Sequence, residues 1–373
     1  MSNIIKKFDI SSELEKLKNT VTLAKRAENT NNIKIDNVST LNYTNDVEEV
    51  DCSLVSFDND KLNSYIDKLE NFSDFTDCMN GNYIKIPIGN TNFIPQGSCQ
   101  VGDYTLLVGY TKGENSTLYV MDKNGNVIKN ITLDGSYHCG GISYDSCTGS
   151  VYITGKSGAD NGKSSYINQY SLNDILNNNG SELVPTNKIQ VDNNNSLKSS
   201  TNDKSSVAYL TVNDGYLYAG NFDKDGKGII KKFKINSDGS LGDAVIINNP
   251  FEKTQGMCIY NYNGTDYYMF TSSHGKGNPS NIYIATMDKN GNLVKCGQMT
   301  LPCMAEQISN CGDNGISILF ESCAKEYRGA ANEVIDDICY LDPEKILSLS
   351  GAISSTNTIL MENGNPNSGM ATM

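Results

Sequence analysis

Short runs in which hydrophobic and polar residues alternate recur along most of the chain from Tyr83 onward. Such alternation places one face of a run against a core and therefore predicts β-strands. The clearest group lies at 255–301, where four runs are separated by Asn263-Gly264, a glycine-rich loop and a turn at 289–292. These four runs predict one antiparallel meander joined by tight turns.

The meander at 255–301 is a repeat of an earlier one at 96–133. Gln96-Gly97-Ser98-Cys99 corresponds to Gln255-Gly256-Met257-Cys258, and Asp-Lys-Asn-Gly-Asn occurs at both 122–126 and 288–292. One four-stranded sheet cannot bury both of its faces until other sheets pack around it. Repeats of about 40 to 50 residues with four strands each therefore predict an all-β fold, the β-propeller.

The number of blades follows from the starts of the innermost strands. We expect these strands to begin near residues 96, 139, 207, 255 and 306, which predicts five blades. The fifth blade lacks an outer strand of its own, and the run YIKIPI at 83–88 is a strand without a blade. We therefore expect the N-terminal strand to close the last blade, which removes exposed sheet edges. Six blades is the alternative, if the N-terminal arm or the run at 358–361 builds extra sheet.

The segments outside the repeats differ in composition. We expect an N-terminal helical arm and linker at 1–81, the propeller at 82–350 and a C-terminal tail at 351–373. Within the arm, Ser12 and Glu15 fit a capping box, and hydrophobic residues follow helical spacing between Ile10 and Glu28. This short α-helix joins subunits of a homo-oligomer in one interpretation, and packs on its own domain in the other.

Composition limits the class of partner. The 373 residues carry a formal net charge of −13 with a pI near 4.7, which argues against nucleic-acid binding through a basic surface. No apolar signal segment and no membrane-spanning run is visible, so we expect a cytoplasmic protein, with export by another route left open. The 11 cysteines form no CxxC pair, and we interpret them as structural thiols.

One face of the predicted propeller carries many cations. Loops between second and third strands lie on the same face as the loops between blades, and they are rich in Lys, Arg and Gly. Their cations are Lys112, Lys156, Lys163, Lys224, Lys227, Lys276, Lys325 and Arg328. This rim predicts attraction of a small polar or anionic ligand, while ordinary solvated loops are the alternative.

The inner strands begin with polar residues that would line the mouth of the central channel on this face. We expect Gln96, His138 and Gln255 to bind a ligand there, together with Lys276 and Arg328 of the rim. Buried polar groups at such a mouth must be satisfied by one another, by water or by a ligand.

Acid–base candidates accompany this set. Glu306 and Glu321 flank adjacent strands of the fifth blade, and His274 lies in a loop of the fourth. Paired carboxyls with different pKa values can act as acid and base. The alternative for Glu321 is an ion pair with Lys325 or Arg328. A metal held by both histidines and Glu306 requires the His274 loop to fold inward, so we assign no metal, and the cofactor stays open.

Four segments resemble those of uncharacterised bacterial β-propeller proteins: 138–145 (HCGGISYD), 254–260 (TQGMCIY), 270–284 (FTSSHGKGNPSNIYI) and 304–329 (MAEQI to LFESCAKEYRG). The resemblance implies the fold, because propellers serve many functions. Two functions follow as hypotheses. The first is a non-catalytic scaffold that binds a polar or anionic ligand, or a protein partner, on its loop face. The second is a hydrolase or lyase acting on a carbohydrate or lactone at the channel mouth.

Overall fold

The structure is a computed structural model that describes residues 68–87, 92–155, 166–191, 207–226 and 228–353. The chain divides into two units, Met1–Cys52 and Ser53–Met373, and all described residues belong to the second. The predicted N-terminal helix and the run at 358–361 lie outside the described residues.

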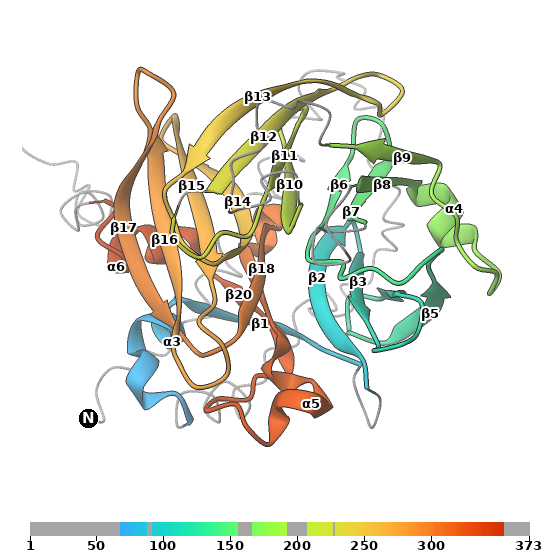
Figure 1. Ribbon diagram of the computed structural model, residues 1–373. Helices are drawn as coiled ribbons and strands as arrows, with labels where there is room; N and C mark the ends of the chain where they lie inside the picture. Colours follow the sequence, from blue (N-terminus) through green and yellow to red (C-terminus); the bar gives the residue numbers. More distant parts are fainter. Residues whose placement is uncertain (1–67, 88–91, 156–165, 192–206, 227, 354–373) are drawn as a thin grey trace, which may run out of the picture. The chain divides into compact units, whose positions relative to one another are not determined.

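The described part of the second unit contains five four-stranded antiparallel sheets (Figure 1). Each sheet is one blade, and its strands are named here from the innermost outward. The blades are β2 (Ile94–Val101), β3 (Tyr104–Tyr110), β4 (Thr117–Met121) and β5 (Val127–Thr132); β6 (Ile142–Asp145), β7 (Ser150–Thr154), β8 (Tyr166–Ser171) and β9 (Asn187–Gln190); β10 (Tyr209–Asn213), β11 (Tyr216–Gly220), β12 (Gly228–Ile235) and β13 (Leu241–Asn249); β14 (Thr254–Tyr262), β15 (Thr265–Ser272), β16 (Ser280–Met287) and β17 (Leu293–Leu301); and β18 (Ala305–Asn310), β19 (Ile316–Phe320), β20 (Asp337–Leu341) and β1 (Met79–Lys85).

The predicted closure of the last blade is confirmed. β1 pairs with β20, with Tyr83 opposite Cys339 and Lys85 opposite Asp337. The strand begins at Met79, four residues earlier than the sequence pattern predicted, and an irregularity in register separates Met79 from Tyr83. An N-terminal strand thus completes a blade whose other three strands come from the C-terminal end, which ties the two ends of the repeat array together.

The inner strands of neighbouring blades contact one another around the whole ring, in the order β2, β6, β10, β14, β18 and back to β2. Glycines permit this close approach. A Cβ atom added at Gly141 would lie 2.6 Å from the backbone nitrogen of Leu210, and one at Gly256 would lie 2.7 Å from that of Ile308. Neither position can therefore carry a side chain without backbone movement.

A glutamine crosses the centre of the ring. The Gln307 amide donates to the backbone carbonyl of Ile142 at 2.6 Å and accepts from the Ile142 N–H at 2.9 Å. Its nitrogen also donates to Ser309 Oγ, and Ser309 Oγ donates to the Ser98 carbonyl. These bonds join blades one, two and five at their innermost strands.

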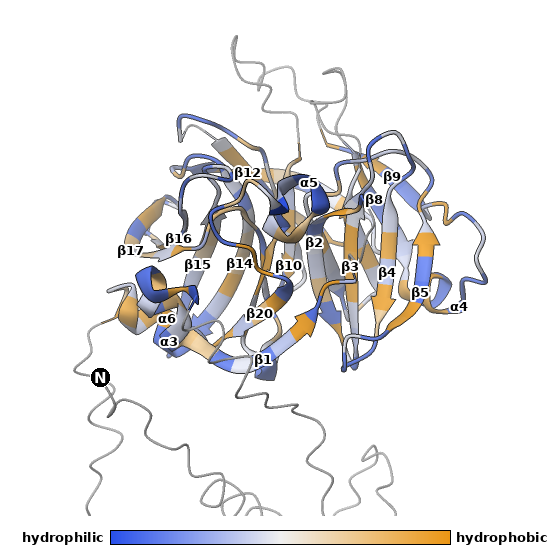
Figure 2. Ribbon diagram, turned by 90° about the horizontal axis from the view of Figure 1, so that it is seen from below, coloured by the Kyte–Doolittle hydropathy of each residue, from blue (hydrophilic) through white to orange (hydrophobic). Residues whose placement is uncertain are grey.

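Hydrophobic side chains fill the space between the blades, in agreement with the alternating pattern. All five residues of β19 and of β20 are buried. Figure 2 shows hydrophobic residues interspersed with hydrophilic ones along the strands, while many of the loops are hydrophilic. Burial on both faces is what a sheet inside a ring of sheets requires.

Short helices lie at the edges of the ring, and none of the described helices is long and apolar enough to cross a bilayer. They are η1 (Glu70–Phe72), α3 (Ser73–Cys78), α4 (Leu172–Asn177), η4 (Gly312–Asn314), η5 (Glu321–Cys323), α5 (Lys325–Arg328) and α6 (Pro343–Leu349). α3 contacts α6, and Phe75 packs edge-on against Phe320 with ring centroids 5.8 Å apart. α4 lies between β8 and β9 of blade two.

Candidate functional site

Two glutamates of the last blade meet at one mouth of the channel. Glu306 is the second residue of β18, and Glu321 begins η5 directly after β19. Their carboxyl groups hydrogen-bond to each other. Glu306 is 2% exposed, and Glu321 is half-buried above it. The structure thus brings together the two carboxylates that the sequence singled out.

Two glutamines hold this pair from neighbouring blades. Gln255 Nε2 donates to Glu306 Oε1 at 3.1 Å, and Gln96 Nε2 donates to Glu321 Oε2 at 2.9 Å. The Gln96 amide also donates to the Pro95 carbonyl, and its own buried oxygen has no hydrogen-bond partner. The mouth therefore contains one amide donor for each carboxyl group and one buried acceptor whose hydrogen-bonding capacity is unused.

The strands that carry these side chains are irregular at this point. The register of β2 shifts between Pro95 and Gly97, that of β14 between Thr254 and Gly256, and that of β18 between Ala305 and Ile308. A bulge turns a side chain away from the alternation of a regular strand. The bulges at Gln96, Gln255 and Glu306 thus explain how three inner strands direct polar side chains toward one point.

Burial raises the pKa of both carboxyls. Desolvation is the main cause at Glu306, whose pKa lies well above its usual value, and the charge of Glu321 adds to the effect. Desolvation also raises the pKa of Glu321, to about 7, against the opposing effect of the Gln96 hydrogen bond. Two carboxyls in contact cannot both ionise easily, so the pair retains at least one proton at neutral pH.

Aromatic side chains border the pair on one side. Tyr110, at the end of β3, lies against His138 with ring centroids 5.1 Å apart. The hydroxyls of Tyr110 and Tyr327 interact with each other, and burial together with the charge of Glu321 raises the pKa of both. The structure thus places His138 beside Tyr110. Both tyrosines were missed, because a tyrosine at a strand end or in a short helix carries no sequence signal of a site.

A lysine and a histidine lie on the side of blade four. Lys253 precedes β14, and its Nζ lies 3.0 Å from Nδ1 of His274, which follows β15. Burial and the positive charge of Lys253 lower the pKa of His274, while Glu252 acts in the opposite direction. The partner of His274 is thus Lys253, a loop residue whose position carries no sequence signal of a site.

The predicted cationic rim is partly neutralised. Arg328 forms an ion pair with Asp336, and Lys112 forms one with Glu326 at 2.7 Å. Lys276 is exposed. Neither Arg328 nor Lys112 is therefore available as an uncompensated charge. The contacts of Glu321 are with Gln96 and Glu306, and Arg328 takes Asp336 in place of Glu321.

Among the described residues, no three side chains of His, Cys, Asp or Glu converge in a way that could hold a metal ion. Asp145 lies at the far end of β6, where it accepts hydrogen bonds from Thr148 and Cys147 in a turn. The Asp223 carboxylate accepts from the Asp225 N–H, as expected of a turn.

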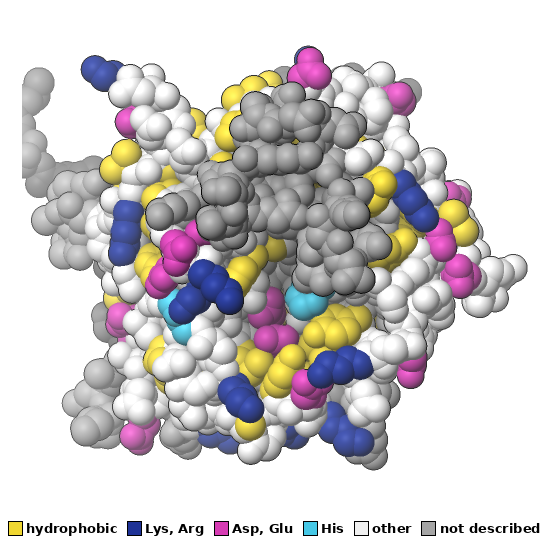
Figure 3. All heavy atoms as spheres, in the orientation of Figure 1, with side chains coloured by type: hydrophobic (Ala, Val, Ile, Leu, Met, Phe, Trp, Pro, Cys, Tyr) yellow, Lys and Arg dark blue, Asp and Glu magenta, His cyan; other side chains and the backbone are white. Residues whose placement is uncertain are grey.

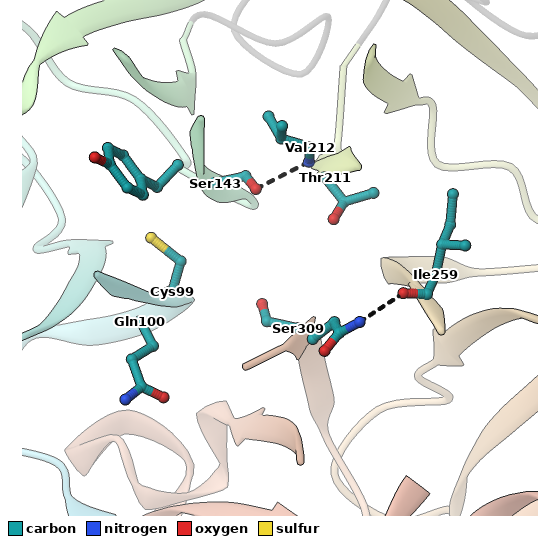
Figure 4. Close-up of a pocket in the computed structure, with 9 residues that line it drawn as sticks. Cys99, Gln100, Ser143, Thr211, Val212, Ile259 and Ser309 are labelled. Atoms are coloured by element: carbon teal, nitrogen blue, oxygen red, sulfur yellow. Dashed lines mark hydrogen bonds between the residues drawn. The ribbon is translucent and has the colours of Figure 1, made fainter. Parts of the chain in front are cut away.

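Figure 3 shows the mouth as a hollow with acidic side chains at its floor, histidine side chains on both sides and basic side chains on its rim. The inner strands also enclose a separate cavity of about 70 Å³. It is lined by Cys99, Gln100, Ser143, Tyr144, Thr211, Val212, Ile259, Ser309 and Asn310 (Figure 4). The lining of this second cavity contains no Asp, Glu, His, Lys or Arg, so the acidic, basic and histidine side chains described above belong to the mouth.

No family model matches the chain, and no curated protein matches it. Among solved structures, the WD40 β-propeller domain of Doa1 is similar at 10% identity and a TM-score of 0.36, over 72% of this chain and 99% of that one. An engineered GH43 glycoside hydrolase is similar at 13% identity and a TM-score of 0.39, over 69% of this chain and 51% of that one. The exo-β-1,3-galactanase of Phanerochaete chrysosporium is similar at 12% identity and a TM-score of 0.39, over 65% of this chain and 59% of that one. Over the residues that the structure describes, the chain is a mostly β protein with five propeller blades, as its own sheets show.

Proposed function

We propose that this protein is a hydrolase that cleaves a lactone or another ester of a small polar molecule at the mouth of its propeller. The observation that carries the proposal is the hydrogen-bonded pair of Glu306 and Glu321 in the half-buried mouth. A buried pair of carboxyls with raised pKa values is costly for stability, and such groups concentrate at functional sites.

The contact between the carboxyls favours ester chemistry over glycoside hydrolysis. Two glutamates that act on a glycosidic bond stand roughly 5–5.5 Å apart in retaining enzymes and about 6.5–9.5 Å apart in inverting ones. Hydrogen-bonded oxygens lie only about 2.5–3 Å apart. A pair that shares one proton resembles instead the paired carboxyls that activate a water molecule for attack on a carbonyl carbon.

The reaction needs one proton to be taken and one to be given. The ionised carboxylate removes a proton from water, and the water oxygen forms a bond to the carbonyl carbon. The carbon–oxygen bond of the ester then breaks, and the protonated carboxyl gives its proton to the departing alcohol oxygen. One acid and one alcohol result, and the pair again holds a single proton. The Gln255 and Gln96 amides orient the two carboxyls for these transfers.

A non-catalytic propeller that binds a polar ligand is the second candidate. It is favoured by the two glutamine amides, which already occupy one oxygen of each carboxyl group. In that case the mouth is a recognition site in which Gln96, Gln255, His138 and the glutamates contact a ligand that leaves unchanged.

The test is a hydrolysis assay with a set of sugar lactones and p-nitrophenyl esters on the wild type, Glu306→Gln and Glu321→Gln. We expect both variants to lose at least about a hundredfold in kcat/KM, the usual contribution of a general acid or base. Glu344→Gln, in the first turn of α6, is the matched control and keeps full activity. Retention of wild-type rates in both site variants would refute the mechanism, and ligand binding without product would establish the second candidate.

A further inference from the structure

We infer that Lys253 and His274 form an anion-binding subsite beside the acid pair, and that the ligand of this mouth carries a carboxylate. This inference specifies the substrate class of the proposed function and rests on it for the catalytic step. The subsite itself rests on contacts of its own.

The hydrogen bonds define the protonation of His274. Lys253 Nζ lies 3.0 Å from Nδ1, and an ammonium can only donate, so Nδ1 is the accepting nitrogen. Ser272 Oγ donates to the Glu252 carbonyl at 2.7 Å, which uses the hydroxyl proton. The same oxygen lies 3.4 Å from Nε2 of His274, so it accepts the Nε2 proton. His274 is therefore a neutral ring within a chain of donors that starts at Lys253.

The lysine has donor capacity left over. One proton of its ammonium group is directed at His274, and two remain. Within the ranges that the structure describes, the three ion pairs are Lys112–Glu326, Lys188–Asp134 and Arg328–Asp336, so Lys253 forms none. Glu252 is the acidic group near enough to affect His274, and its charge also reaches Tyr283. An ammonium without a paired carboxylate, in a chain of net charge −13, favours an anion from outside.

The backbone holds Lys253 in a rarely used conformation. Its φ angle is +51°, in the left-handed region that a side chain other than glycine seldom adopts. The Lys253 N–H donates to the Asp223 carbonyl, and its carbonyl accepts from the Ser273 N–H at 3.2 Å. Such conformations are unfavourable for a residue other than glycine and concentrate at functional sites. The fold therefore maintains this lysine in position despite an unfavourable backbone.

The position of Lys253 in the chain connects the subsite to the acid pair. Lys253 lies two residues before Gln255, whose amide donates to Glu306, so both belong to the same entry into β14. The ionised form of the acid pair repels an anionic group placed directly on it. A cation at the edge of the mouth orients a carboxylate-bearing molecule, so that its anionic end faces Lys253 and its neutral end faces the glutamates.

The test compares galacturonate with galactose, which differs mainly in lacking the carboxylate, by calorimetry at pH 7. We expect galacturonate to bind the wild type more tightly, and Lys253→Met to lose at least about tenfold of that affinity while galactose binding stays the same. Lys112→Met, which removes an exposed and already paired lysine, leaves both affinities unchanged. Equal galacturonate affinity in the wild type and Lys253→Met, or no galacturonate binding to the wild type, would overturn the inference.

A second measurement reads the subsite directly. The chain has two histidines, so proton NMR of the imidazoles is simple, and His274→Asn assigns the signal. A bound carboxylate next to Lys253 offsets the positive charge that lowers the pKa of His274, so we expect galacturonate to raise this pKa and galactose not to. Galacturonate binding that persists in Glu306→Gln, with no lactone or ester hydrolysed by the wild type, would retain the subsite and reject the hydrolase.

Discussion

The carboxyl groups of Glu306 and Glu321 hydrogen-bond to each other although β18 and β19, from which they extend, run in opposite directions. Ala305, at the start of β18, is paired with Phe320, at the end of β19. Glu306 and Glu321 directly follow these two residues and therefore lie at the same end of the sheet. The bulge after Ala305 and the turn into η5 then direct both side chains inward. An acid pair thus results from one pair of neighbouring strand ends.

The acid pair makes stability depend on pH. Both folded-state pKa values are raised above the usual 4.5, and that of Glu321 reaches about 7. The native state therefore binds more protons than the unfolded state between these values, and the free energy of unfolding falls as pH rises from about 4.5 to 7. Glu306→Gln removes the buried ionisable group and is expected to flatten this fall. Urea denaturation of the wild type and the variant at several pH values measures how the free energy of unfolding depends on pH.

We expect Glu306→Gln to be more stable than the wild type at pH 8, because the glutamine cannot carry the negative charge that burial disfavours at this position. At pH 4.5 the variant and the wild type should differ little. A variant less stable than the wild type at pH 8 would contradict the interpretation that burial of the pair is unfavourable.

Gly97 allows the centre of the ring to close. A Cβ atom at this position would lie 2.6 Å from Gln307 Oε1 and 3.1 Å from a methyl carbon of Val108. We expect Gly97→Ala to displace the Gln307 amide from the Ile142 backbone and to cost about 1–3 kcal/mol. Gly277→Ala is the control, because nothing lies within 4 Å of its added Cβ. Equal thermal denaturation midpoints for the two variants would argue against a closed centre.

The strand β1 contributes to stability through its buried face. Ile84 is 7% exposed and pairs with Ile338, whereas the next residue, Lys85, is exposed. Ile84→Ala is expected to cost about 2–4 kcal/mol, because it leaves a cavity between the closing strand and the core. Lys85→Ala should change the free energy of unfolding by less than about 0.5 kcal/mol. If Ile84→Ala lowered the free energy of unfolding no more than Lys85→Ala, β1 would not be required to close the ring.

Thiol reactivity should follow burial. Cys147 lies exposed in the turn after β6, while Cys258 is buried with its pKa raised by desolvation. The thiolate is the reactive form, so we expect an aromatic disulfide reagent to modify Cys147 rapidly in the native protein and Cys258 only on unfolding. Cys147→Ser should remove one equivalent of rapidly reacting thiol, and Cys258→Ser should remove none. An unchanged rapid phase in Cys147→Ser would refute this order.

Much of the architecture was predictable because it depends on local patterns. Alternating strands, the turn Asp-Lys-Asn-Gly-Asn and the repeated Gln-Gly start identified five blades, and the unpaired run near Tyr83 indicated the closing strand. The start of β1 at Met79 was missed, because Asn80-Gly81-Asn82 has the composition of a turn, although burial alternates from Met79 to Gly81.

The site was predictable only in part. Glu306, Gln96 and Gln255 were identifiable as starts of inner strands, so the repeat itself placed them at one mouth. The residues that these side chains contact could not be identified from the sequence. Lys253 and Tyr327 lie in loops or short helices whose periodicity carries no information, and the partner of Arg328 proved to be Asp336.

The sequence by itself determined which residues become strands and how many blades they form, because hydrophobic alternation and turn residues act over a few neighbouring positions. The tertiary structure alone decided that Glu306 and Glu321 touch, that Gln307 fills the centre, and that Lys253 faces His274. These contacts depend on bulges and on packing between blades that are far apart in the chain. Burial there, rather than residue type, raises the carboxyl pKa values and gives the mouth its chemistry.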